Sequence, residues 1–298
     1  YETLLGRDLS EEELLIVQNK FDKMYVTKDI YKIYGWFLEE CGYPALPDVE
    51  YEKRKLEYED VFPVLYLKYR LTGKAVHNHI KHLVIDEMQD YSRLQYLIIR
   101  RMFSCKMTIL GDRAQTMADQ QQDVLQFLPG IFGKDLRRIE MRKSYRNTVE
   151  IASYAANLIG VTDLELFERH GMPVLERDVT DLEAALREAV DTLFPEEKTY
   201  ETAAVIVPDE KTAERAYLIL REILAEKDFD CEKRLSWLNR DSSSFKKGLT
   251  VTTFYLAKGL EFDQVFSIFP KDEKREMMMQ AQYIAATSAL HELRVYHI

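Results

Sequence analysis

The stretch HLVIDEMQD, residues 82–90, decides the fold class of this chain. It starts as a short, largely apolar run and ends in acidic residues, among them Asp86 and Glu87. The stretch KMTILGD, residues 106–112, has the same design, with a glycine and an aspartate at its end. Short apolar runs that end in polar residues are typical of buried parallel strands. Ligands bind at the carboxyl ends of strands in α/β sheets, so both polar ends are candidate parts of a site.

Strand-like and helix-like segments alternate on the C-terminal side of these stretches, and a helical part precedes them. The alternation predicts an α/β protein with parallel sheets. Residues 128–130, Leu-Pro-Gly, predict a turn and a candidate domain boundary. Strands are expected at residues 82–85, 106–110, 136–141, 202–207, 249–254, 264–269 and 294–298. Helices are expected at residues 10–24, 29–40, 50–69 with a break at Pro63, 92–103, 148–159, 208–224 and 274–293.

The composition indicates a globular protein of about two domains. The chain has 298 residues, 46% of them hydrophobic, and a formal net charge of −10. These values exclude wholesale disorder. The acid excess speaks against a protein that holds nucleic acid by bulk charge, although a local basic groove stays compatible with it.

The sequence gives little support for a metal-binding, disulfide-rich or membrane-spanning protein. The three cysteines form no CxxC pair, so neither a zinc knuckle nor a disulfide framework is indicated, and a reducing, cytoplasmic compartment is expected. The HxHxxH pattern at residues 77–82 is interpreted as packing or solvated histidines. No apolar run is long enough to span a bilayer, so no membrane partner is expected. The first residue is tyrosine, which favours a fragment of a longer protein, and a monomer is the expectation.

Two further segments carry side chains suited to phosphate chemistry. The segment GDRAQ, residues 111–115, puts a glycine where the backbone can approach a ligand closely, and Gln115 can both donate and accept hydrogen bonds. The segment SYR, residues 144–146, precedes an expected helix, and Arg146 offers a planar fork for phosphate oxygens. A solvated charged face is the competing interpretation of the basic cluster around it. That cluster comprises Lys134, Arg137, Arg138, Arg142, Lys143 and Arg146.

Five motifs, taken together and in order, resemble those of one enzyme family. The chain is similar over roughly residues 79–293 to superfamily 1 helicases of the UvrD type. Finer wording resembles the HelD branch, which is related to DNA helicase IV and uses ATP to help clear RNA polymerase from DNA. That wording is YEDVFPVLYLKYRLTG (58–73), YLAKGLEFD (255–263) and ALHEL (289–293). The five motifs are DEMQD (86–90), GDRAQ (111–115), SYR (144–146), AKGLEFD (257–263) and YIAATSALHEL (283–293).

The resemblance implies RecA-like P-loop NTPase motor domains that use ATP and Mg²⁺, and it assigns a role to each matching residue. Asp86 would ligate Mg²⁺ and Glu87 would be the catalytic base. Gln115 would couple the γ-phosphate to the nucleic-acid side, and Arg146 would contact the γ-phosphate. Glu261 would lie near the nucleotide, at the ribose.

The resemblance also implies a nucleic-acid face and a domain plan. Thr253 and Tyr255 occupy positions that lie toward single-stranded DNA in the family, where Tyr255 would stack on a base or pack within the fold. Residues 1–78 would be a helical insertion of the first motor domain. Residues 79–132 would be the C-terminal part of that partial RecA-like domain, and residues 133–298 a complete second one.

The sequence departs from the family at the phosphate loop. It contains no GxxxxGK[ST], because its two Gly-Lys pairs, 73–74 and 133–134, are followed by alanine and aspartate. The family carries this loop upstream of the motifs found here. Without its N–H cradle and lysine, ATP loses its main anchor. The chain alone is therefore expected neither to bind ATP tightly nor to hydrolyse it.

A second departure lies in the last motif. The family has Thr-Arg-Ala, with the arginine at the γ-phosphate, where this chain has Ser288 between Thr287 and Ala289. Loss of such an arginine predicts slow hydrolysis or the use of another cation. Real divergence is favoured because the flanking motif residues fall in register. A slip of the alignment toward Arg294 is the competing account.

Three functions follow as alternatives. The first is a fragment of an ATP-dependent motor that acts on single-stranded DNA and RNA polymerase. The second is a degenerate helicase-like module that binds RNA polymerase or another protein without catalysis, which Ser288 and the acidic charge favour. The third, a carboxylate nuclease built on Asp86 and Glu87, is disfavoured because no lysine partner lies near them in the sequence.

Overall fold

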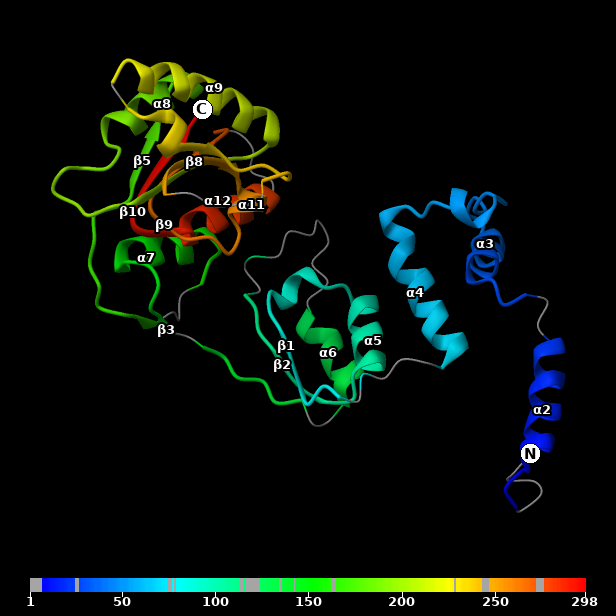
Figure 1. Cartoon of the computed structure of the whole chain (residues 1–298). Coiled ribbons are helices and arrows are strands. Elements are labelled where there is room, and N and C mark those ends of the chain that lie inside the picture. The colour runs from blue at the N-terminus through cyan, green and yellow to red at the C-terminus, as the bar shows by residue number, and fades with distance from the viewer. Residues whose placement is uncertain are drawn as a thin grey trace. The chain divides into compact units, whose positions relative to one another are not determined.

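In the computed structural model of the chain, contacts divide the protein into two compact units (Figure 1). The first unit comprises Tyr1–Asp86, Tyr91–Leu110 and Val124–Leu136. The second comprises Glu87–Asp90, Gly111–Asp123 and Arg137–Ile298. The structure describes residues 7–24, 27–73, 77, 79–112, 115, 124–133, 136–141, 143–161, 165–227, 229–242, 247–271 and 276–298.

Helices form the first unit up to Gly73. The predicted start of the first helix is confirmed, because Glu13 N donates to Ser10 Oγ and Ser10 N donates to the Glu13 carboxylate. The predicted break at Pro63 is wrong, since helix α4 (Tyr58–Thr72) runs through it. The helix is capped by Gly73, which has φ 63°. α4 packs on α3 (Ile30–Glu40), and these contacts outweigh the single backbone hydrogen bond that proline removes. The elements are α2 (Glu11–Met24), α3 (Ile30–Glu40), η1 (Tyr51–Lys53) and α4 (Tyr58–Thr72).

A two-stranded parallel sheet completes the first unit. β1 (His82–Ile85) pairs in parallel with β2 (Lys106–Ile109), and α5 (Arg93–Met102) connects them, as predicted. The expected buried strands are buried on one face only, where they pack against α5 and α6 (Val124–Phe132). The turn expected at residues 128–130 is wrong, because these residues lie inside α6.

The second unit is built on a six-stranded, all-parallel sheet with the order β5-β10-β9-β6-β8-β7. A separate parallel pair, β3 (Lys143–Ser144) and β4 (Glu165–Leu166), precedes it. The strands are β5 (Leu175–Asp178), β6 (Thr202–Val207), β7 (Leu235–Trp237), β8 (Gly248–Thr253), β9 (Phe262–Phe269) and β10 (Ala289–His297). The helices are α7 (Val149–Leu158), α8 (Leu182–Asp191), α9 (Glu210–Ala225), α10 (Cys231–Arg234), α11 (Phe254–Ala257) and α12 (Glu276–Thr287), and η2 (Met88–Asp90) also belongs to this unit.

Helices cover both faces of this sheet (Figure 1). α8 and α9 pack on one face, against Val205, Val251 and Phe266. α7, α11 and α12 pack on the other, against Ile206 and Phe269. Strands that are buried on both faces are typical of parallel sheets. The predicted α/β class with parallel sheets is confirmed, with a two-stranded sheet in the first unit and a six-stranded sheet in the second.

Two expectations about the second unit are wrong. Residues 136–141 form no strand. The helix expected at residues 274–293 ends at Thr287 within its described part, and β10 begins at Ala289. Residues 289–293 contain good helix formers, but β10 lies between β9 and β5 and pairs with both. This pairing overrides local preference, as tertiary context often does.

Candidate functional site

A buried glutamine holds the carboxylate of Glu87. Gln89 is only 7% exposed, and its Nε2 donates to Glu87 Oε2 at 2.6 Å. Its Oε1 accepts from the backbone N–H of Asp112 at 3.1 Å, so Gln89 ties the DEMQD motif to the GDRAQ motif. Glu87 itself has φ 52°, a left-handed conformation that is uncommon for a residue other than glycine. Gln89 lies within the DEMQD motif, but the motif pattern assigns it no role.

Gly111 is required by the close approach of this glutamine. A Cβ at position 111 would lie 2.4 Å from Gln89 Oε1 and 2.6 Å from Met88 N. From its place in the GDRAQ motif, Gly111 is expected to let a ligand approach the backbone closely. Among the described residues, Gln89 and Met88 are the neighbours that leave no room for a side chain at position 111.

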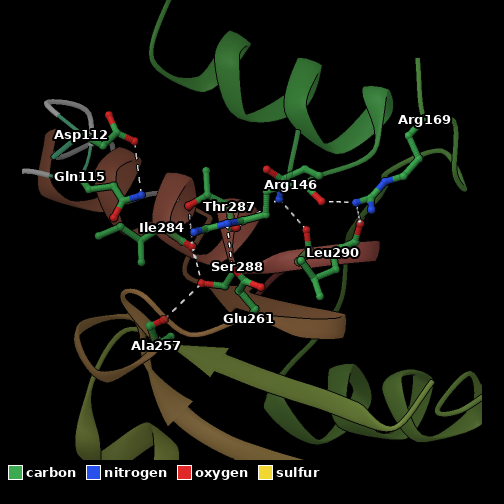
Figure 2. Close-up of polar contacts among 12 residues, drawn as sticks. Asp112, Gln115, Arg146, Arg169, Ala257, Glu261, Ile284, Thr287, Ser288 and Leu290 are labelled. Carbon is green, nitrogen blue, oxygen red and sulfur yellow. Dashed lines mark hydrogen bonds and ion pairs between the residues drawn. The ribbon is translucent and has the colours of Figure 1, made fainter. Parts of the chain in front are cut away.

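Asp112 is the acceptor of a second small network. Its Oδ2 accepts from Gln115 Nε2 at 3.3 Å (Figure 2). The same oxygen accepts from Tyr283 OH at 3.0 Å. Burial, followed by the charge of Asp112, raises the pKa of Tyr283 well above its usual range, so its hydroxyl is a neutral donor. The network brings the predicted sensor Gln115 together with Asp112 and, through Asp112, with α12.

Lys258, from the AKGLEFD motif, lies against the acidic motif. Its side chain is 7% exposed, and its Nζ is 2.5 Å from Asp90 Oδ1 and 3.7 Å from Glu87 Oε2. No lysine lies near these acids in the sequence, but the fold brings Lys258 to them. Asp90 and Lys258 are 168 positions apart, and no local sequence signal points to this contact.

Asp86 directly follows β1 and is exposed. Mg²⁺ takes one or two carboxylate oxygens and fills its other positions with phosphate oxygens and water. An exposed carboxylate at the carboxyl end of a parallel strand fits this donor set. Among the described residues no three His, Cys, Asp or Glu side chains form a group that could hold a metal by themselves.

Arg146 and Glu261 form an ion pair in the second unit. Arg146 Nε lies 2.8 Å from Glu261 Oε1, and the two side chains are 48% and 45% exposed (Figure 2). Arg146 follows β3 closely, and Glu261 directly precedes β9. The structure thus brings together the two residues that the resemblance assigns to the γ-phosphate and the ribose.

Ser288 is a buried packing residue at the junction between α12 and β10. It is 3% exposed, and its Oγ donates to Ile284 O at 2.9 Å and lies 3.4 Å from Ala257 O (Figure 2). Arg294 lies within β10, where its Nε donates to Glu292 Oε1 at 2.9 Å. Arg294 is thus in a strand and does not share a helix with Ser288.

The two residues predicted to face DNA differ in accessibility. Thr253 ends β8 and is 3% exposed, whereas Tyr255, in α11, is 46% exposed. The Tyr255 ring lies 3.8 Å from the Phe254 ring, centroid to centroid, and its hydroxyl donates to Met277 Sδ at 3.7 Å. Of the two, Tyr255 offers a surface on which a base could stack.

The basic cluster and the histidines are engaged locally. Lys143 lies over the rings of Tyr145 and Phe167, while Lys134 and Arg142 fall outside the described residues. The ring of His77 stacks on Phe103 with centroids 5.1 Å apart.

No helix in the described part of the chain has the length and hydropathy needed to cross a membrane.

Comparison with known families then adds an independent finding. Residues 7–117 match the UvrD/REP helicase N-terminal domain. This match supports a superfamily 1 helicase. It covers less than half of the chain, and no curated protein matches the sequence.

Several solved structures are similar to the chain. One is the C-terminal domain of a possible DNA helicase from Lactobacillus plantarum WCFS1, with 23% identity and a TM-score of 0.38 over 52% of this chain and 88% of that one. The others are arterivirus nonstructural protein 10, a helicase (14%, 0.37, 72% and 38%), and the PRRSV helicase (14%, 0.37, 80% and 45%). The chain spans less than half the length of the two viral helicases.

Proposed function

We propose that this chain is part of an ATP-driven superfamily 1 motor that moves on single-stranded DNA. The main support is the ion pair of Arg146 and Glu261 at 2.8 Å, because it joins two separate motifs whose residues are expected at the nucleotide. Arg146 would take the γ-phosphate and Glu261 the ribose. Asp86 would hold Mg²⁺, and Glu87 would activate the attacking water.

A second support is the order around the proposed base. Gln89 fixes one oxygen of Glu87 and also binds the backbone of Asp112, whose carboxylate binds Gln115. A base and a phosphate sensor that share one hydrogen-bond chain can respond to the same phosphate. Hydrolysis would also need a GxxxxGK[ST] loop from outside these 298 residues.

The test compares ATP turnover of the 298-residue chain with that of a longer protein in which it is joined to such a loop. The isolated chain should show no steady turnover. In the longer protein, Glu87→Gln should lower kcat by about 10²–10⁴-fold, the usual contribution of a general base. Glu168→Gln, at an exposed position, is the matched control and should change nothing. Equal rates for wild type and Glu87→Gln would refute the assigned role.

Within this proposal, the chain is HelD-like, acts on RNA polymerase–DNA complexes in the cytoplasm, and is a monomer. The support is the HelD-like wording of residues 58–73, 255–263 and 289–293, together with the net charge of −10, which suits a basic protein groove better than DNA. Gel filtration of the chain with purified core RNA polymerase should show one complex that weakens with salt. Tight binding to single-stranded DNA without any complex with polymerase would contradict this assignment.

A second candidate is a helicase-like module that binds a protein without catalysis. Ser288 favours it, because the position of the family's arginine is filled by a buried serine. The helical part also exposes large apolar side chains, with Trp36 at 48%, Phe37 at 54% and Tyr58 at 73%, as protein-binding surfaces do. Polymerase binding by a longer protein that has an intact phosphate loop but no ATPase activity would favour this candidate.

A further inference from the structure

The backbone at Arg146 is tied to a distant segment by another arginine. Nη2 of Arg169 donates to Arg146 O and also to Leu290 O, the latter at 3.0 Å (Figure 2). Arg169 and Leu290 are 121 positions apart. A single guanidinium nitrogen therefore joins the SYR segment to the first residues of β10.

The loop that carries Arg169 is itself held against α7. Arg169 O accepts from Val149 N at 2.9 Å, and Gly171 N donates to Glu150 Oε2 at 2.8 Å. A Cβ at Gly171 would lie 2.6 Å from Thr148 Cγ2, so only glycine allows this approach. The guanidinium of Arg169 thus projects from a fixed base.

The Arg146 side chain is held much less firmly than its backbone. Its guanidinium is 48% exposed, and its described ion pair is the one with Glu261, which is also nearly half exposed. Exposed ion pairs of this kind contribute little to stability and exchange readily. A phosphate-binding arginine benefits from a backbone that is already fixed, because binding then orders fewer groups and costs less entropy. It also benefits from an ion-pair partner, here Glu261, that a phosphate can replace.

We propose that Arg169 is a positioning residue for Arg146. It holds the Arg146 carbonyl against β10 and so aims the Arg146 guanidinium, whose role at a phosphate rests on the function proposed above. A guanidinium suits this task because it is always charged and one of its nitrogens can donate to two carbonyls. Nε of Arg169 is buried without a hydrogen-bond partner among the described residues, which costs stability.

The first test follows the Nε–Hε signal of Arg146 by NMR in the 298-residue chain, assigned through its loss in Arg146→Lys. Arg169→Met keeps the apolar stem and removes every donor, so the Arg146 signal should move to the position of solvent-exposed arginines. Arg169→Lys should restore part of the shift. Arg177→Ala, which removes a surface arginine paired with Glu188, is the control and should leave the signal in place. An unchanged signal in folded Arg169→Met overturns the proposal.

If Arg169→Met does not fold, Gly171→Ala takes its place. Its Cβ would displace the loop from Thr148 while all donors of Arg169 remain, so the same movement of the Arg146 signal is expected and its absence overturns the proposal. The second test uses ATP turnover in the longer protein. Arg169→Met should lower kcat by up to about 100-fold, as misplacement of a catalytic group does, and should add nothing to Arg146→Ala. If the two substitutions lower kcat independently, so that their effects multiply in the double variant, the proposal is overturned. If the wild-type longer protein shows no turnover, only the proposed function is refuted, and the NMR test still applies.

Discussion

Replacement of Asn147 by alanine should destabilise the second unit by about 2 kcal/mol. The residue is 8% exposed, and its Nδ2 donates to Thr287 O at 3.1 Å and to Ala289 O at 2.6 Å. A hydrogen bond contributes about 0.5–1.5 kcal/mol net, so the pair accounts for about 1–3 kcal/mol. For a folding unit of this size, that loss lowers the Tm by about 4–8 °C.

Asn147→Asp makes the prediction sharper. The aspartate has nearly the same shape as asparagine, but it puts an oxygen where the donor was, facing two carbonyl oxygens. It also buries a charge without a partner, which costs more than an unfilled space. Asn147→Asp should therefore be less stable than Asn147→Ala, although it fills the site better.

The two tryptophans allow this measurement on one unit. Trp36 lies in α3 of the first unit and Trp237 in β7 of the second, where it stacks on Tyr217 with ring centroids 6.1 Å apart. In a Trp36→Phe background, the fluorescence of Trp237 follows urea unfolding of the second unit alone. Free energies of unfolding are then compared at a constant m-value.

Asn157→Ala is the matched control, because Asn157 is an exposed residue of α7 and surface changes stay within about 0.5 kcal/mol. The reasoning is refuted if Asn147→Ala is as stable as this control. It is also refuted if Asn147→Asp equals or exceeds Asn147→Ala, because the orientation of the amide donor would then not matter.

Three further predictions concern stability under the same urea assay. Ser288→Arg should lose about 1–3 kcal/mol through overpacking of a 3% exposed site and gain no ATPase activity, and a rise in kcat would contradict this. Gly111→Ala should destabilise by a similar amount, because its Cβ would lie 2.4 Å from a buried amide oxygen, whereas the surface control Asn157→Ala in the same unit should not. Burial raises the pKa of Glu150, but hydrogen bonds from a backbone N–H and a histidine outweigh it and lower the pKa from 4.5 to about 2. Its contribution is therefore complete above pH 4.5 and is lost as the pH falls toward 2, and Glu150→Gln should flatten this part of the stability profile.

Much of the second unit could be predicted because its buried strands are visible in the sequence. Residues 203–207 form an uninterrupted apolar run, and β6 has the predicted bounds Thr202–Val207. The boundary at 288–289 could not be predicted, because residues 289–293 prefer a helix locally and become a strand only by pairing with β9 and β5. Pro63 and Pro129 were misread for a related reason, since each lies in a helix that packs against neighbouring helices.

The site shows the same division between local and distant information. Sequence motifs identify Glu87, Arg146 and Glu261 as candidates, because each lies in a short pattern of neighbouring residues. The partners that hold them come from elsewhere: Lys258 reaches Glu87 and Asp90, and Arg169 reaches the Arg146 carbonyl. Partners so distant in the chain leave no local spacing to read. Gln89 was the exception, since it lies inside a quoted motif and a glutamine between acids already indicates a possible bridge.

Ser288 bears on whether the chain belongs to a motor or to a binder. Its hydroxyl satisfies carbonyls of α12 and of Ala257, so the serine is built into the junction that Asn147 and Arg169 also hold. An arginine introduced there would have to leave that buried space, and the junction would lose its hydrogen bonds. Under the function proposed above, the charge at a γ-phosphate comes from Arg146, whose carbonyl accepts from Arg169 and whose side chain pairs with Glu261. Because that ion pair is nearly half exposed and exchanges readily, a phosphate can displace Glu261 at little cost, and the missing arginine is expected to limit turnover.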